Sequence, residues 1–315
     1  MDIFYIIAGL LLVLAGAHLL TEGAAATAEK FGVSQFMIGL TVIAVGTSAP
    51  ELVVSLSAAI KGNADMAVGN VIGSNIFNVF VILGLCSAIS PLTLTRRNVR
   101  ADIPFALAAS VLLFIFASDS LLHFGTADRI NRAEGGILLL LYITLMVYTM
   151  RTSGHRKDSV RTPPRMGMTR AALFVILGLA ALVGGSEMFV DGAREFATKM
   201  GVSQSLIAIT LVAVGTSLPE LAAGIASVIK GHSDMALGNV LGSNIFNILF
   251  TLGSCAIITP LSTNGIDTLD LAMVVLSALL PFVFAFTFGG RRINRMEGII
   301  LLVIYALYMR SLLMK

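Results

Sequence analysis

Charged residues are scarce in this chain of 315 residues. Asp, Glu, Lys and Arg make up 12% of it, whereas 57% is hydrophobic and the mean hydropathy is +0.92. Soluble domains carry about 25% charged residues. The composition therefore excludes a water-soluble globular domain and indicates a membrane protein with several spans. The formal net charge of +3 gives no reason to expect nucleic acid binding.

Nitrogen and sulfur ligands are also few. The two cysteines, Cys86 and Cys255, lie within apolar segments, where a role as small core side chains is favoured over redox chemistry. The four histidines form no metal-binding pattern. HExxH, GxSxG and paired-aspartate motifs are missing, so the sequence does not support an intramembrane hydrolase or another enzyme, and no cofactor is expected.

Long apolar segments are abundant, and ten of them can cross a bilayer, which takes about 20 helical residues. Backbone groups in hydrocarbon must be satisfied internally, and these segments lack the alternation of barrel strands, so the predicted fold is all-α. The first segment is longer than a secretory signal and is interpreted as a span. The ten predicted spans cover residues 3–27, 33–60, 66–88, 101–118, 133–150, 170–197, 203–229, 235–258, 269–288 and 295–313.

A polar segment at residues 151–169, RTSGHRKDSVRTPPRMGMT, separates two halves of five predicted spans each, residues 1–150 and 170–315. Lysine and arginine are about twice as frequent in the loops on the side of this linker as in the loops on the other side, and such residues favour the cytoplasmic face. This bias predicts a cytoplasmic linker in the cell (inner) membrane, with both termini outside.

The two halves repeat each other. GVSQFMIGLTVIAVGTSAPELVVS, which begins at Gly32, reappears as GVSQSLIAITLVAVGTSLPELAAG from Gly201, and GNVIGSNIFN reappears as GNVLGSNIFN at the same offset of 169 residues. Because each half has an odd number of predicted spans, the second half enters the membrane from the opposite side. Inverted repeats are typical of secondary transporters, whose binding sites lie at the repeat interface.

Each repeat places a proline and then a glutamate in the middle of a long apolar helix, in VGTSAPE and VGTSLPE. Proline cannot donate to the carbonyl four residues back, so the helix is expected to open there and free carbonyl oxygens. The glutamates are Glu51 and Glu220, and an acid at mid-helix costs roughly 2.5 to 3.5 kcal/mol. No lysine or arginine lies inside these helices, so a bound cation is the favoured partner. A protonated glutamate in a structural hydrogen bond is the alternative.

The next helix of each repeat carries GSNIFN. Ser and Asn four residues apart share one helix face. The glycines before them permit close helix packing, which by itself could explain those glycines. Carboxylate, hydroxyl, amide and carbonyl oxygens without thiolate or imidazole favour calcium or sodium over zinc or copper. The candidate ligands in this motif are Ser74, Asn78, Ser243 and Asn247.

With GTSAPE, GTSLPE and two GSNIFN segments, the chain resembles the calcium/cation antiporter superfamily, and most of all prokaryotic sodium/calcium exchangers. The resemblance implies ten helices in two inverted five-helix repeats, with a long first and sixth helix that slide against four central ones. It implies Glu51 and Glu220 as central ligands shared by calcium and sodium. The further metal ligands that it implies are the oxygens of Thr47, Thr216, Ala44, Ala213, Ser48, Ser217, Ser74, Ser243, Asn78 and Asn247.

One position departs from several relatives, including potassium-dependent exchangers, which carry aspartate where this chain has Asn247. Two formal carboxylates remain, which weakens the case for potassium co-transport. The predicted function is secondary active exchange of sodium for calcium by alternating access, electrogenic if the family's stoichiometry holds. Calcium/proton antiport stays open as an alternative, and a passive cation channel is less favoured because no filter motif is present. The expected partners are the two ions and the bilayer; no protein partner can be inferred.

Overall fold

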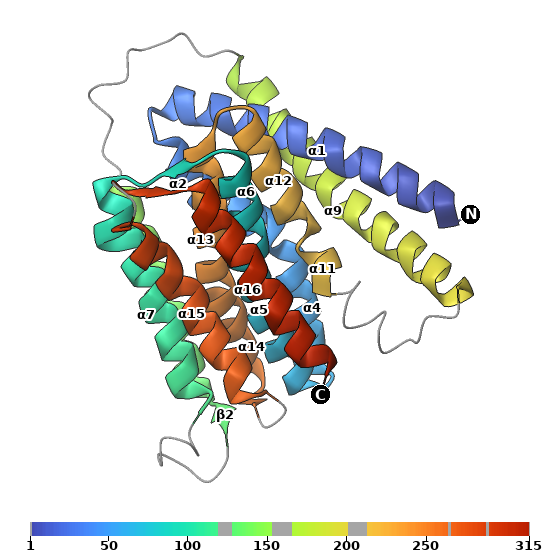
Figure 1. Ribbon diagram of the computed structural model, residues 1–315, viewed down its shortest axis with the longest axis vertical. Helices are drawn as coiled ribbons and strands as arrows, with labels where there is room; N and C mark the ends of the chain where they lie inside the picture. The colour runs from blue at the N-terminus through green and yellow to red at the C-terminus, as the bar shows by residue number, and fades with distance from the viewer. Residues whose placement is uncertain are drawn as a thin grey trace. The chain divides into compact units, whose positions relative to one another are not determined.

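The computed structural model describes residues 2–118, 128–152, 166–200, 213–263, 266–287 and 290–314, which are mostly helical (Figure 1). Most of the predicted linker (153–165) and the start of the predicted seventh span (203–212) lie outside these residues. Contacts within the chain define two compact units. The first unit is Met1–Pro50 with Ser153–Val240, and the second unit is Glu51–Thr152 with Leu241–Lys315. Each unit thus draws on both halves of the sequence.

Helices, several of them with a wider π-helical turn (η), account for most of the described structure. The first unit holds α1 (Asp2–Phe31), α2 (Gln35–Ile38), η1 (Gly39–Ile43), α3 (Ala44–Thr47), α9 (Met168–Lys199), α11 (Ala213–Thr216), α12 (Leu218–Ile229) and the start of α13 (Ser233–Ile245). The second unit holds most of α4 (Ala49–Ile60), α5 (Ala64–Phe77), η2 (Asn78–Leu83), α6 (Gly84–Ile89), β1 (Leu92–Thr93), η3 (Asn98–Asp102), α7 (Ile103–Phe116), β2 (Arg129–Ile130), α8 (Arg132–Thr152), η5 (Phe246–Leu252), α14 (Gly253–Ile258), β3 (Leu261–Ser262), α15 (Thr268–Phe284), β4 (Arg292–Ile293) and α16 (Arg295–Leu313).

The helical fold and the membrane character expected from the composition are confirmed within the described residues. Two further apolar helices, α12 and α15, are shorter than a full span, and the bent pair Gln35–Thr47 and Ala49–Ile60 qualifies as a span if it is taken as one. In the part of the chain that the structure describes, six stretches are long and apolar enough by themselves: Asp2–Phe31, Ala64–Ile89, Asn98–Phe116, Arg132–Arg151, Met168–Phe196 and Ser233–Ile258.

The two longest helices, α1 and α9, lie side by side along their length (Figure 1). Glycine allows this close approach, because it recurs every seven residues, two helical turns, on both contact faces. A Cβ added at Gly16 would lie only 2.7 Å from the backbone nitrogen of Leu182, and one added at Gly185 would lie 2.8 Å from that of Val13. The glycines in this repeat are Gly9, Gly16, Gly23, Gly178, Gly185 and Gly192.

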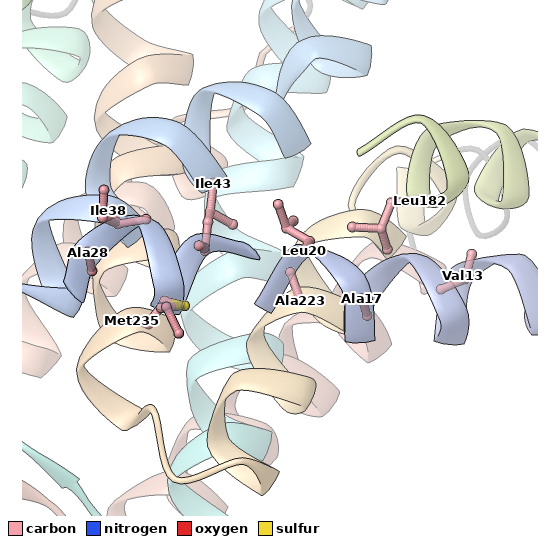
Figure 2. Close-up of a cluster of buried hydrophobic side chains, with 11 residues drawn as sticks. Val13, Ala17, Leu20, Ala28, Ile38, Ile43, Leu182, Ala223 and Met235 are labelled. Atoms are coloured by element: carbon pink, nitrogen blue, oxygen red, sulfur yellow. The ribbon is translucent and has the colours of Figure 1, made fainter. Parts of the chain in front are cut away.

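The core of the first unit lies where α1 meets its neighbours (Figure 2). Leu20 of α1 and Leu182 of α9 are both fully buried there, beside Ile43 of η1 and Ala223 of α12. Small alanines on α1 let these larger side chains fit between the helices. The position of α12, which carries Glu220, is therefore fixed by apolar contacts with α1.

In the second unit, the repeated sequences RINRAEG and RINRMEG each perform the same structural task. Their isoleucines, Ile130 and Ile293, are fully buried in two-residue strands, and β2 pairs with β3 while β1 pairs with β4. In each sequence the asparagine and the glutamate three residues later cap the start of the following helix, α8 or α16. Arg132 and Arg295 donate to the last carbonyls of α14 and α6. These short strands are a small departure from the all-α prediction.

Candidate ion-binding site

Both glutamates follow a break in a helix. The first break falls at Ser48, between α3 and α4, where the helix axis bends by 45°, and the second falls at Ser217, between α11 and α12. Pro50 and Pro219 are each the second residue of the new helix, a place where the missing N–H costs little. The predicted interruptions are present. The Ala44 carbonyl accepts the backbone N–H of Ser48 at 3.0 Å, so one of its two lone pairs is already engaged.

Glu220 lies in the first turn of α12 and is fully buried, with 0% of its surface exposed. Its Oε1 accepts a hydrogen bond from the Ser48 hydroxyl at 2.7 Å. Its Oε2 is buried and has no hydrogen-bond donor among the described residues. A buried carboxylate oxygen without a donor is costly unless a proton or a cation compensates it.

Two side chains of the first unit hold the backbone around Glu220. Asn239 of α13 donates to the Glu220 carbonyl at 3.4 Å, and Thr47 donates to the amide oxygen of Asn239 at 3.4 Å. Thr47 is fully buried, and its hydroxyl also lies 3.0 Å from the carbonyl of Ile43. A chain of polar contacts therefore connects the first helix break to the backbone of Glu220.

Glu51 has a comparable setting within the second unit. It is fully buried, and its Oε1 accepts a hydrogen bond from the Ser74 hydroxyl at 3.4 Å. Asn70 of α5 donates to the Glu51 carbonyl at 3.3 Å and to the Ser55 hydroxyl at 3.0 Å. Among the described residues, no three His, Cys, Asp or Glu side chains gather in one place. The described contacts of each glutamate come from hydroxyl and amide groups.

The two GSNIFN segments meet in the second unit through four asparagines. Asn78 donates to the Asn244 amide oxygen at 3.0 Å, and Asn247 donates to the Asn75 amide oxygen at 3.3 Å. Asn75 and Asn244 donate to each other's backbone carbonyls at 3.3 and 3.2 Å. The arrangement repeats under the offset of 169 residues, and the amide oxygens of Asn78 and Asn247 are buried without a donor among the described residues.

The other predicted ligands are less fully defined. The hydroxyls of Thr216 and Ser243 are buried and have no described hydrogen-bond partner. Ser217 is fully buried at the second helix break. Ala213 is the first described residue of α11. The described contacts thus bring together Ser48 with Glu220, Ser74 with Glu51, and Asn78 and Asn247 with two further asparagines.

Four asparagines of this region, at positions 70, 75, 239 and 244, were not among the predicted site residues. A signal for them was present in the sequence, because each repeats at the offset of 169 residues, as the predicted ligands do. Periodicity could not assign them, since their role depends on which helices face each other. The π-helical turns η2 and η5, which begin at Asn78 and Phe246, also went unpredicted; such turns are frequent at functional sites.

Comparisons with known proteins identify the family of this chain. The family profile described as "Sodium/calcium exchanger protein" matches residues 1–151 and 170–314. The sodium/calcium exchanger MaX1 of Methanosarcina acetivorans is 31% identical over 334 aligned residues, which cover 96% of this chain and 95% of that protein. The inner membrane protein YrbG of Escherichia coli is 37% identical over 81% of this chain and 79% of its own length.

A solved structure is similar over nearly the whole chain. It is a structure of the sodium-calcium exchanger NCX_Mj soaked with 10 mM Na+ and 10 mM Sr2+, with a TM-score of 0.86 and 32% sequence identity, and it covers 99% of this chain and 98% of that one. The resemblance expected from the repeated motifs is confirmed. This chain belongs to the sodium/calcium exchanger protein family.

Proposed function

We propose that the protein exchanges sodium for calcium across the cell membrane by alternating access. The observation that carries this proposal is the fully buried carboxylate of Glu220, one oxygen of which has no described hydrogen-bond donor. A cation at that oxygen would compensate the buried charge. Two carboxylates, Glu51 and Glu220, would neutralise one calcium ion, and sodium ions would compete for the same oxygens.

The proposed ligands include both glutamates, as the resemblance implies. Within the first unit Ser48 donates to Glu220, and within the second unit Ser74 donates to Glu51. The remaining proposed ligands are Thr47, Thr216, Ser48, Ser217, Ser74, Ser243, Asn78, Asn247 and the carbonyls of Ala44 and Ala213.

Sodium is favoured over protons as the counter-ion by the neutral oxygens. The amide oxygens of Asn78 and Asn247 and the hydroxyls of Thr216 and Ser243 are buried without a described hydrogen-bond donor or acceptor. Such oxygens are suitable ligands for sodium and calcium and have no use in a site that only protonates two glutamates. Calcium/proton exchange is the second candidate, because buried glutamates can take up protons.

A flux assay separates the two candidates. Proteoliposomes loaded with sodium and clamped at equal pH inside and outside are expected to take up calcium when sodium leaves. If each cycle moves one net charge, worth roughly 2.3 kcal/mol per 100 mV, an imposed membrane potential will change the rate. Uptake that follows a pH gradient equally well without sodium would support the proton mechanism, and uptake that needs no counter-ion would indicate a channel.

The topology is part of the same proposal: ten spans in two inverted five-helix repeats, with a cytoplasmic linker and both termini outside the inner membrane. The near-complete family match to residues 1–151 and 170–314, with the linker between them, supports two repeats. Both native cysteines are buried, so a cysteine introduced at Ser159 in the linker should react with a membrane-impermeant thiol reagent only from the cytoplasmic side. Labelling from outside the cell would contradict this topology.

The hydrogen bond from Ser48 to Glu220 gives a specific prediction. Ser48→Ala removes a donor to a buried carboxylate, and hydrogen bonds to charged groups contribute about 1.5 to 3 kcal/mol. We therefore expect the calcium concentration for half-maximal uptake to rise about tenfold or more. Ser227→Ala is the matched control, because Ser227 is also buried on α12 but donates only to its own helix, at Ala223. Equal affinities in the two variants would show that the Ser48 bond does not support the site.

A further inference from the structure

The four asparagines of the GSNIFN segments form two series of hydrogen bonds. In each series a backbone carbonyl at one end determines which side-chain groups donate and which accept. A backbone carbonyl can only accept, so the Asn75 side chain must turn its NH2 group toward the Asn244 carbonyl, and Asn244 must do the same toward the Asn75 carbonyl. Each amide oxygen then points away from that contact. The orientation of both side chains is therefore determined by their partners.

The orientation of Asn75 and Asn244 in turn determines the orientation of the asparagines bonded to them. The oriented amide oxygen of Asn75 accepts from the Asn247 NH2 group, and that of Asn244 accepts from the Asn78 NH2 group. With their NH2 groups engaged, Asn247 and Asn78 keep their oxygens available. All four side chains are buried, at 6% exposed for Asn244 and 0% for the others. Water cannot easily replace a lost partner at that depth.

We propose that Asn75 and Asn244 are positioning residues, which hold the amide oxygens of Asn247 and Asn78 ready to bind the transported cation. This inference rests on the proposed function, in which Asn78 and Asn247 are ligands. Partners that orient a metal ligand affect affinity strongly even though they do not touch the metal, and their loss typically costs about 10- to 100-fold in binding. A reversed amide would present its NH2 group to the cation and repel it.

The hydrogen bond between Asn75 and Asn247 also accounts for the neutral residue at position 247. An aspartate at that position would set a carboxylate oxygen against the Asn75 amide oxygen, at the 3.3 Å where the hydrogen bond now lies. Two acceptors at that distance repel each other. Asn75 thus restricts the residue at position 247 to a hydrogen-bond donor and limits the formal charge of the site to the two glutamates.

A purely structural role for these bonds is the competing explanation, since asparagines often link membrane helices. Double-mutant cycles separate the two roles, because residues that act through one another show coupled effects. The measurement is calcium binding to the purified full-length protein in detergent by titration calorimetry. It does not depend on which counter-ion drives transport.

We expect Asn244→Ala to weaken calcium binding at least about tenfold but to add little when Asn78 is already alanine. Asn75→Ala and Asn247→Ala should behave in the same way. The control is the double variant Asn244→Ala with Asn247→Ala, which combines residues from different hydrogen-bonded pairs. The reductions in calcium affinity caused by its two substitutions should multiply. If the effects of Asn244→Ala and Asn78→Ala multiply instead, or if Asn244→Ala lowers thermal stability without changing calcium affinity, the positioning role is wrong.

A second comparison tests the same inference without relying on the truncation of two neighbouring side chains. Asn75→Ala should weaken calcium binding in the natural background but strengthen it in an Asn247→Asp background, where it removes the repelling oxygen. A structural link would make Asn75→Ala unfavourable in both. If the natural chain binds calcium but Asn75→Ala changes calcium affinity in the same direction in both backgrounds, only the positioning role is overturned. No calcium binding by the natural chain would overturn the proposed function and this inference with it.

Discussion

Glu220→Gln and Glu51→Gln are each expected to abolish sodium-dependent calcium uptake. Both side chains are fully buried, and glutamine keeps their shape while removing one of the two formal charges that would neutralise calcium. Breaking a buried charge pair costs about 3 to 5 kcal/mol, which corresponds to more than about a hundredfold in calcium affinity. Uptake into sodium-loaded proteoliposomes, measured over a range of calcium concentrations, tests this.

Glu195→Gln is the matched control for both variants. It is the same chemical change on α9, but Glu195 is 55% exposed and pairs only with Lys199 among the described side chains. Its uptake should equal that of the natural protein. Thermal unfolding of each variant in detergent shows whether the fold is kept. Full uptake by either Glu51→Gln or Glu220→Gln would exclude that glutamate as an essential ligand.

The second large effect is expected at Gly238, where a methyl group has no room. A Cβ added at Gly238 of α13 would lie 2.2 Å from the carbonyl oxygen of Phe36 and 3.0 Å from the nitrogen of Leu40. Both atoms belong to the backbone, so α13 would have to move away from α2 and η1. Overpacking of this kind costs about 1 to 3 kcal/mol. Gly238→Ala should therefore lower the midpoint of thermal unfolding and reduce uptake. An unchanged midpoint of thermal unfolding together with unchanged uptake in Gly238→Ala would show that helix packing at Gly238 is looser than the structure indicates.

The close packing at Gly238 shows the limit of the motif as a guide. The sequence places Gly238 in GNVLG and correctly indicates close packing as one use for its glycines. The motif does not say that Phe36 and Leu40 supply the backbone against it. The partner of a helix face is set by residues far away in the sequence.

The serines beside the glutamates give a similar contrast. Periodicity predicts that Ser74 shares a helix face with Asn78, and the structure joins Ser74 to Glu51. The link from Ser48 to Glu220 connects residues 172 positions apart and follows from no local pattern. The described bond to Glu51 thus comes from a GSNIFN segment, and the described bond to Glu220 comes from a helix break.

The sequence by itself determined the membrane class, the helical fold, the family and the two buried acids that break the apolar pattern. Those features are local, because hydropathy, proline and an isolated charge act over a turn or two of helix. The tertiary structure alone decided which donors face Glu51 and Glu220, and that Asn75 and Asn244 fix the amides of Asn247 and Asn78. Hydrogen-bond direction depends on which groups meet across helices, and that is settled only when the helices pack.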